Sequence, residues 1–175
     1  FWIVLSVSGS IPFILFGFGV VDSFFESMSG ITTTGATVIA GLDDLPKSLL
    51  IYRQLLQWLG GMGLIVLAIA VMPLLGIGGG QLFKTQTPGP MSEQRLTPRI
   101  TSTARALWSI YFVLTVLCIF AYRLAGMSYF DAVSHAFSTV SIGGFSTHDL
   151  SIGFFDSLSI EIVCITFMLL SAMSF

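Results

Sequence analysis

Long apolar runs alternate with short polar stretches along this chain of 175 residues. Three runs contain no charged residue, and they cover residues 2–21, 54–81 and 106–122. A transmembrane helix needs about 20 such residues, within a range of roughly 17 to 25. The pattern therefore predicts three membrane-spanning helices. It also predicts a fourth over residues 162–175, which is still apolar where the sequence ends.

Two shorter segments between these runs repeat one physical pattern. The first reads DSFFESMSGITTTGAT at residues 22–37, and the second reads DAVSHAFSTVSIGGFS at residues 131–146. Aligned without a gap, they are identical at three of sixteen positions, Asp22/Asp131, Ser29/Ser138 and Gly35/Gly144. Each predicts a short helix, over 22–31 or 129–139, followed by non-helical backbone that ends on glycine. Since neither segment is long or apolar enough to cross a bilayer, we interpret both as re-entrant pore segments.

The distribution of charge predicts how the chain is oriented in the membrane. Residues 84–105 are polar, contain three prolines, and carry four basic residues against one acid. The loops and segments on the other side together carry eight acids against three basic residues. Because basic loops stay in the cytoplasm, the linker is expected inside and both pore segments are expected to enter from outside. The two repeats would then be parallel, which disfavours transporters built on inverted repeats.

The predicted fold is an all-α membrane protein with tandem parallel helix–pore loop–helix repeats and re-entrant pore helices, resembling a potassium channel in architecture. Residues 1–83 are expected to form the first repeat and residues 84–105 a cytoplasmic linker. Residues 106–175 are expected to form the second repeat, truncated in its last helix.

Composition supports a membrane protein and excludes several classes of function. The chain is 54% hydrophobic and 9% charged, with a mean hydropathy of +0.92, whereas soluble domains are about 25% charged. A net charge of −2 gives no basis for nucleic-acid binding. His135 has serines nearby but no Ser/His/Asp spacing, so we expect no enzyme. Cys118 and Cys164 lie in apolar runs, where a thiol is usually a small hydrophobic group.

The non-helical parts of the two segments are the candidate selectivity filter. A desolvated potassium ion needs inward-facing backbone carbonyls, and turning them inward often requires positive φ values that glycine adopts without steric strain. The candidate filter residues are Thr32, Thr33, Thr34, Gly35, Val140, Ser141, Ile142, Gly143 and Gly144. Within this set, the expected potassium contacts are Thr33, Thr34, Ile142 and Gly143.

The chemistry of these residues points to a monovalent ion as the cargo. Neither filter sequence contains a carboxylate, which argues against a divalent or acid-ring site. Hydroxyl groups in the two candidate filter segments are expected either to add ion ligands or to hold the loop in place. The carboxyl end of each short helix directs partial negative charge at the ion. Thr37, just past Gly35, is expected to matter much less. Potassium is thus expected as the transported ion, with no bound cofactor.

Four separated motifs closely resemble the Trk-type potassium uptake proteins of bacteria, which are pore-forming membrane subunits of the Trk/Ktr/HKT superfamily. The motifs are TTTGAT at 32–37, QWLGGMG at 57–63, the linker pair TPGP at 87–90 and LTPRI at 96–100, and SIGGFST at 141–147. They occur in the family's order, and the resemblance covers essentially the whole chain. The helix and linker motifs make it specific, because a hydroxyl-glycine filter alone is a weak signal.

The resemblance implies a multi-pass protein of the bacterial inner membrane, in contact with lipid, with four pore repeats in one chain. It also implies a homodimer and a cytosolic nucleotide-binding regulatory subunit. We therefore expect this chain to be an internal fragment with the first two repeats. The alternative is a two-repeat subunit of a passive potassium channel. A non-transporting membrane scaffold would leave the repeated glycine segments unexplained.

Several other residues have two interpretations each. Arg53 either snorkels to the interface or acts near the outer mouth. Gly60, Gly61 and Gly63 are either a hinge or, more consistently with small-residue packing, a helix contact. His148 and Asp149 are expected to be solvated in an outer loop, and Asp22 and Asp131 to cap helices rather than bind ions.

Overall fold

The computed structural model describes residues 2–71 and 96–174, and every regular element in these ranges is helical, as expected for the all-α class. The elements are α1 (Trp2–Phe16), α2 (Val20–Ile31), η1 (Leu42–Asp44), α3 (Lys47–Val71), α4 (Leu96–Leu124), α5 (Tyr129–Val140), η2 (Ser151–Phe155) and α6 (Leu158–Ser174).

Each half of the chain contains the same series of elements. A long helix is followed by a helix of twelve residues, a non-helical segment, a short 3₁₀ turn and another long helix. The twelve-residue helices α2 and α5 occupy aligned positions in the two similar sequence segments. At about 1.5 Å per residue, each is roughly 18 Å long, well short of the ~30 Å hydrocarbon core of a bilayer.

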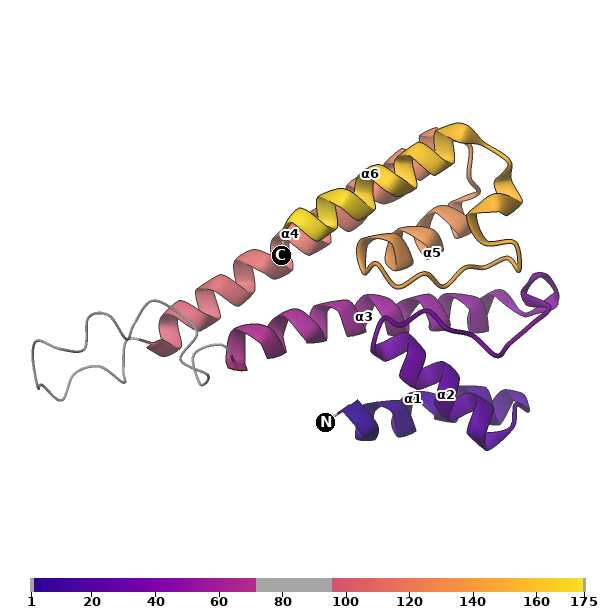
Figure 1. Ribbon diagram of the computed structural model, residues 1–175, viewed down its shortest axis with the longest axis horizontal. Coiled ribbons are helices and arrows are strands. Elements are labelled where there is room, and N and C mark those ends of the chain that lie inside the picture. Colours follow the sequence, from indigo (N-terminus) through magenta and orange to yellow (C-terminus); the bar gives the residue numbers. More distant parts are fainter. Residues whose placement is uncertain (1, 72–95, 175) are drawn as a thin grey trace, which may run out of the picture.

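The short helices lie inside the assembly, between the long ones (Figure 1). Helix α2 packs against α1 and α3, and α5 packs against α3, α4 and α6. Helices α4 and α6 run side by side (Figure 1). Two apolar clusters hold these contacts, one centred on Phe13 and Leu50 and the other on Met62 and Tyr122. Helix α3 contributes to both clusters, so it is the structural link between the two halves.

The helix ends differ from the sequence prediction in three places. Helix α1 stops at Phe16 because Gly17 turns the chain with a φ of 115°. Helix α2 begins at Val20, and its N-cap is Gly19 with no side-chain hydrogen bond, so the prediction that Asp22 caps it was wrong. Helix α4 begins at Leu96, so the last part of the predicted linker is helical. Pro98 is tolerated there because the first turn of a helix needs no N–H donor.

Helix α5 has a side-chain cap, but the capping residue is not the predicted one. The Ser128 hydroxyl oxygen accepts a hydrogen bond from the Asp131 backbone N–H at 3.1 Å. The same hydroxyl donates to the Asp131 carboxylate at 2.7 Å, a reciprocal arrangement that resembles a capping box. Asp131 is therefore the third helical residue of α5, and its carboxylate supports the cap from inside the first turn.

Membrane character is visible in both the span and the exposed surface. Among the residues that the structure describes, one helical stretch, Arg105–Leu124 in α4, is long and apolar enough by length and composition to cross a membrane. The helices Trp2–Phe16 and Leu158–Met173 are apolar but shorter. Apolar side chains on these helices are widely exposed, as in Leu15 (82%) and Phe120 (63%). The predicted span at 54–81 runs into residues 72–95, which lie outside the described ranges.

Candidate functional site

The two candidate filter segments leave their helices with the same backbone geometry. After α2, the Thr33 and Thr34 N–H groups donate to Gly30 O (3.0 Å) and Ser29 O (2.9 Å). After α5, the Ile142 and Gly143 N–H groups donate to Thr139 O (3.1 Å) and Ser138 O (2.8 Å), at the aligned positions. This is the pattern of a Schellman motif, in which a left-handed residue ends the helix.

The left-handed residues at these helix ends are β-branched, which sequence reasoning did not anticipate. Thr33 and Ile142 both have a φ of 54°. Glycine normally occupies this position, and a β-branched side chain at positive φ is an outlier that costs on the order of 1–3 kcal/mol. Such strain is typical of functional segments, and here it occurs at the same place in both copies.

Gly35 and Gly144 follow two residues later, with φ values of 78° and 85°. The prediction that these glycines sit at positive φ is therefore confirmed. A Cβ atom on Gly35 would lie 2.0 Å from the Gly143 carbonyl oxygen, so the two segments approach each other at backbone distance. The structure thus brings the two candidate filter sequences together.

The hydroxyl groups of the segments mainly secure the local backbone. The Thr32 hydroxyl donates to Met28 O at 2.7 Å and lies 2.8 Å from the Thr34 hydroxyl. The Ser141 hydroxyl donates to Ser138 O at 3.2 Å. Val140 is fully buried as the last residue of α5. Of the two roles considered for hydroxyls, the structure shows loop pinning at Thr32 and Ser141.

Among the residues whose burial the structure describes, Arg53 is the largest side chain that is fully buried. Its guanidinium pairs with the Glu26 carboxylate, with Nε to Oε1 at 2.8 Å and Nη2 to Oε1 at 2.6 Å. Nη2 also donates to the Thr37 hydroxyl (3.0 Å), and Nη1 donates to the Ser146 carbonyl (3.2 Å). The snorkelling interpretation was wrong, because a snorkelling arginine keeps its head group in water.

Thr37 also takes part in this network. Its hydroxyl lies 2.8 Å from Glu26 Oε1, and the Val38 N–H donates to Glu26 Oε2 at 3.2 Å. Thr37 was expected to matter much less than the filter glycines, and this stays a prediction about uptake, but its hydroxyl contacts both Glu26 and Arg53. An acid in the first short helix and an arginine in the next helix are compatible with such a pair, but nothing local in the sequence assigns them to each other.

The aligned pair in the second half is His135 and Ser146. His135 Nδ1 donates to the Asp131 carbonyl (2.9 Å), because a carbonyl oxygen only accepts, and Nε2 lies 2.9 Å from the Ser146 hydroxyl. A serine beside a histidine resembles half of a hydrolase site. Both side chains are almost fully buried, at 1% and 6% exposure, and the Ser146 carbonyl is held by Arg53. The pair therefore serves to fix the second segment, as Glu26 and Thr37 fix the first.

Helix α3 contacts the second segment through Gln57, and its glycines lie close to the end of α2, to Tyr111 and to Ser141. The Gln57 side-chain oxygen accepts from the Phe145 N–H at 3.0 Å. A Cβ on Gly60 would lie 2.0 Å from the Ile31 carbonyl oxygen, and one on Gly61 would lie 2.8 Å from the Tyr111 hydroxyl. These distances favour close packing over a hinge, because small residues here let the backbones meet.

The loops that follow the two candidate filter segments contact each other through His148. Its Nδ1 is hydrogen-bonded to Asp43, and its ring stacks on Phe154 at 3.6 Å between centroids. This hydrogen bond from His148 lowers the pKa of Asp43 below its ordinary value of 3.8. Asp149 accepts hydrogen bonds from the Gly41 and Leu42 N–H groups at 3.1 to 3.2 Å. His148 is therefore only partly exposed and packed against Phe154, unlike the solvated residue that was expected, whereas Asp149 is exposed as expected.

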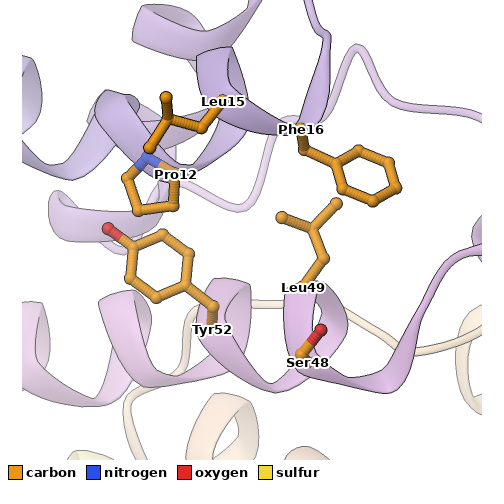
Figure 2. A pocket seen from close by; sticks show the side chains of 6 residues that line it. All are labelled: Pro12, Leu15, Phe16, Ser48, Leu49 and Tyr52. Atoms are coloured by element: carbon orange, nitrogen blue, oxygen red, sulfur yellow. The ribbon is translucent and has the colours of Figure 1, made fainter.

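A cavity of about 440 Å³ lies between α1 and α3, away from the segments (Figure 2). It is lined by Pro12, Leu15, Phe16, Ser48, Leu49 and Tyr52. The Tyr52 hydroxyl is already bonded to Gly9 O at 2.9 Å. Most of the lining is apolar, with Ser48 and Tyr52 as its hydroxyl-bearing residues. Across residues 2–71 and 96–174 there is also no cluster of three or more His, Cys, Asp or Glu that is suited to a metal ion.

Comparison with known proteins agrees with this arrangement. The family model described as "TrkH: Cation transport protein" matches residues 1–175. Among curated relatives, the Trk system potassium uptake protein TrkH of Halomonas elongata is 60% identical over 178 residues, and that of Escherichia coli (strain K12) is 52% identical. Both alignments cover all of this chain and 37% of the relative, so the chain spans about a third of the length of these proteins.

A solved structure is also similar. The crystal structure of the potassium transporter TrkH from Vibrio parahaemolyticus is 55% identical and superposes with a TM-score of 0.83. The match covers 98% of this chain and 34% of that one. With a family model that matches from end to end and a solved relative of the same fold, this chain belongs to the TrkH family of cation transport proteins.

Proposed function

We propose that this chain forms two of the pore repeats of a potassium uptake protein in the bacterial inner membrane. The observation that carries the proposal is the meeting of two equally shaped segments, in which Gly35 lies against the Gly143 carbonyl. Two such segments supply half a ring of carbonyl oxygens. The potassium contacts are the backbone oxygens of Thr33, Thr34, Ile142 and Gly143.

The helices behind the segments support a cation as cargo. The carboxyl ends of α2 and α5 both lead directly into the filter, and a helix carries partial negative charge at that end. The curated relatives are named potassium uptake proteins, which favours uptake over the passive two-repeat channel. In the full-length protein, two further repeats complete the ring. Homodimer assembly and a cytosolic nucleotide-binding regulator belong to the same proposal.

The proposed function is tested with the full-length protein in a bacterial strain that lacks its own potassium uptake systems. We expect growth at limiting potassium and uptake that sodium competes with poorly. Growth equal to that of an empty vector, with the protein present in the membrane, would refute the assignment. Uptake of sodium and potassium at equal rates would refute the filter.

The topology within this proposal has a separate test by cysteine labelling on whole cells. A cysteine at position 44, in η1 of the outer loop, is expected to react with an impermeant reagent. A cysteine at position 93, which lies outside the described residues, is expected to stay unlabelled until the cells are opened. The reverse pattern would overturn the orientation and the re-entrant pore segments together.

A further inference from the structure

We propose that Arg53 is a positioning residue for ion selectivity, which fixes the spacing between the first and second filter segments. The inference rests on the proposed function, because it concerns the same pair of segments. We use the term Arg53 brace for Arg53 together with Glu26, Thr37 and the Ser146 carbonyl.

The brace joins positions that are equivalent in the two segments. Thr37 lies two residues after Gly35, and Ser146 lies two residues after Gly144. Nη2 of Arg53 donates to the Thr37 hydroxyl, while Nη1 of the same guanidinium donates to the Ser146 carbonyl, at 3.0 and 3.2 Å. One rigid, planar group therefore sets the distance between the ends of both segments.

The orientation of the guanidinium is itself fixed by two further contacts, with Glu26 and with the Phe145 ring. Glu26, fully buried in α2, accepts from both Nε and Nη2. The Phe145 ring lies 4.4 Å from the guanidinium carbon, as in a cation–π contact. Because Arg53 and Glu26 both have no exposed side-chain surface, water does not compete for these donors. A buried guanidinium with all these partners has one orientation. It therefore holds the two segments that it contacts at a fixed spacing.

Gln57, one helical turn after Arg53 on α3, contacts the same non-helical segment. Gln57 accepts from the Phe145 N–H, next to the Ser146 carbonyl that Arg53 holds. Residues four apart lie on the same face of a helix. The second segment is thus held from α3 at two adjacent residues, Phe145 and Ser146. The filter oxygens are neutral dipoles, and their spacing discriminates between ions. We therefore expect a weaker contact from Arg53 or Gln57 to change ion selectivity more than it changes the fold.

The test uses Arg53→Lys in the full-length protein, with uptake of potassium measured against competing sodium. Lysine keeps the charge that pairs with Glu26, but one ammonium nitrogen cannot replace two guanidinium nitrogens that contact opposite segments. We expect folded yield close to that of the wild type and a loss of about tenfold in the ratio of potassium to sodium affinity. A merely structural arginine would lower yield and leave this ratio unchanged.

Arg123→Lys is the matched control. Arg123 also donates to a backbone carbonyl, Met127 O at 3.0 Å, and also lies over an aromatic ring, that of Tyr129 at 4.3 Å. It sits at the end of α4 and contacts neither filter segment. We expect this variant to transport with wild-type selectivity. A loss of selectivity equal to that of Arg53→Lys would overturn the inference, because it would be a general effect of replacing arginine.

Thr37→Val keeps the inference testable if Arg53→Lys does not fold. Valine has nearly the same shape and removes only the hydroxyl that Arg53 and Glu26 contact, so we expect a folded protein with reduced selectivity. A folded Thr37→Val protein as selective as the wild type would overturn the brace alone. A wild type that does not distinguish potassium from sodium would instead overturn the proposed function, and the brace with it.

Discussion

Replacing Gly35 with serine in the full-length protein is expected to lower potassium uptake by on the order of 100-fold. Two effects add at this position. A side chain at a φ of 78° is strained by about 1–2 kcal/mol. Its Cβ would also lie 2.0 Å from the Gly143 oxygen, one of the proposed potassium contacts, so the second segment must move away. The variant therefore disturbs both halves of the site.

Gly144→Ser is the comparison that separates the two effects. Its φ of 85° is similar, but a Cβ there meets nothing within 4 Å. Strain alone is expected to lower uptake by about tenfold, with some loss of discrimination against sodium. Uptake at limiting potassium, corrected for protein in the membrane, measures both variants. Equal losses in the two would contradict the close approach of Gly35 to Gly143, and wild-type growth of both would remove these residues from the filter.

Gly60→Ala is expected to have the largest effect on folding, a destabilisation of about 3 kcal/mol or more. The added Cβ would lie 2.0 Å from the Ile31 carbonyl oxygen and 2.7 Å from its carbon. Those atoms belong to the backbone where α2 ends, so no side-chain rotation relieves the overlap. Thermal unfolding and monodisperse yield in detergent report the change.

Gly63→Ala is the matched control in the same motif of α3. A Cβ there lies 3.5 Å from the Trp2 ring, an ordinary van der Waals contact. We expect wild-type yield or slightly better, because alanine also favours a helix over glycine by roughly 1 kcal/mol. If Gly60→Ala and Gly63→Ala unfold at the same temperature, α2 and α3 do not pack as closely as the structure shows.

The sequence predicted the elements whose signals are local. The runs of apolar residues predicted the long helices. The two hydroxyl-glycine segments predicted the positive φ values of Gly35 and Gly144, because glycine adopts such values without steric strain. The left-handed Thr33 and Ile142 were missed for the converse reason, since β-branched residues locally oppose that conformation. Only the surrounding contacts can impose it.

The Arg53 brace could not be predicted because its acceptors come from positions 26, 37 and 146. No local pattern relates a carbonyl after the second segment to a side chain in the first half. The contact of His148 with Asp43 is missed for the same reason. In both cases the fold brings together partners that are far apart in the sequence.

The dependence of both segments on α3 has a consequence for the order in which the protein is built. Helix α6 occupies the place in the second half that α3 occupies in the first, yet its sequence contains no arginine or lysine. Within Leu158–Ser174, helix α6 therefore offers no guanidinium or ammonium group equivalent to that of Arg53. Chains emerge from the ribosome N-terminal end first, so both Glu26 and α3 are synthesised before the second segment. The helix that holds the second segment is therefore already part of the chain when that segment is synthesised.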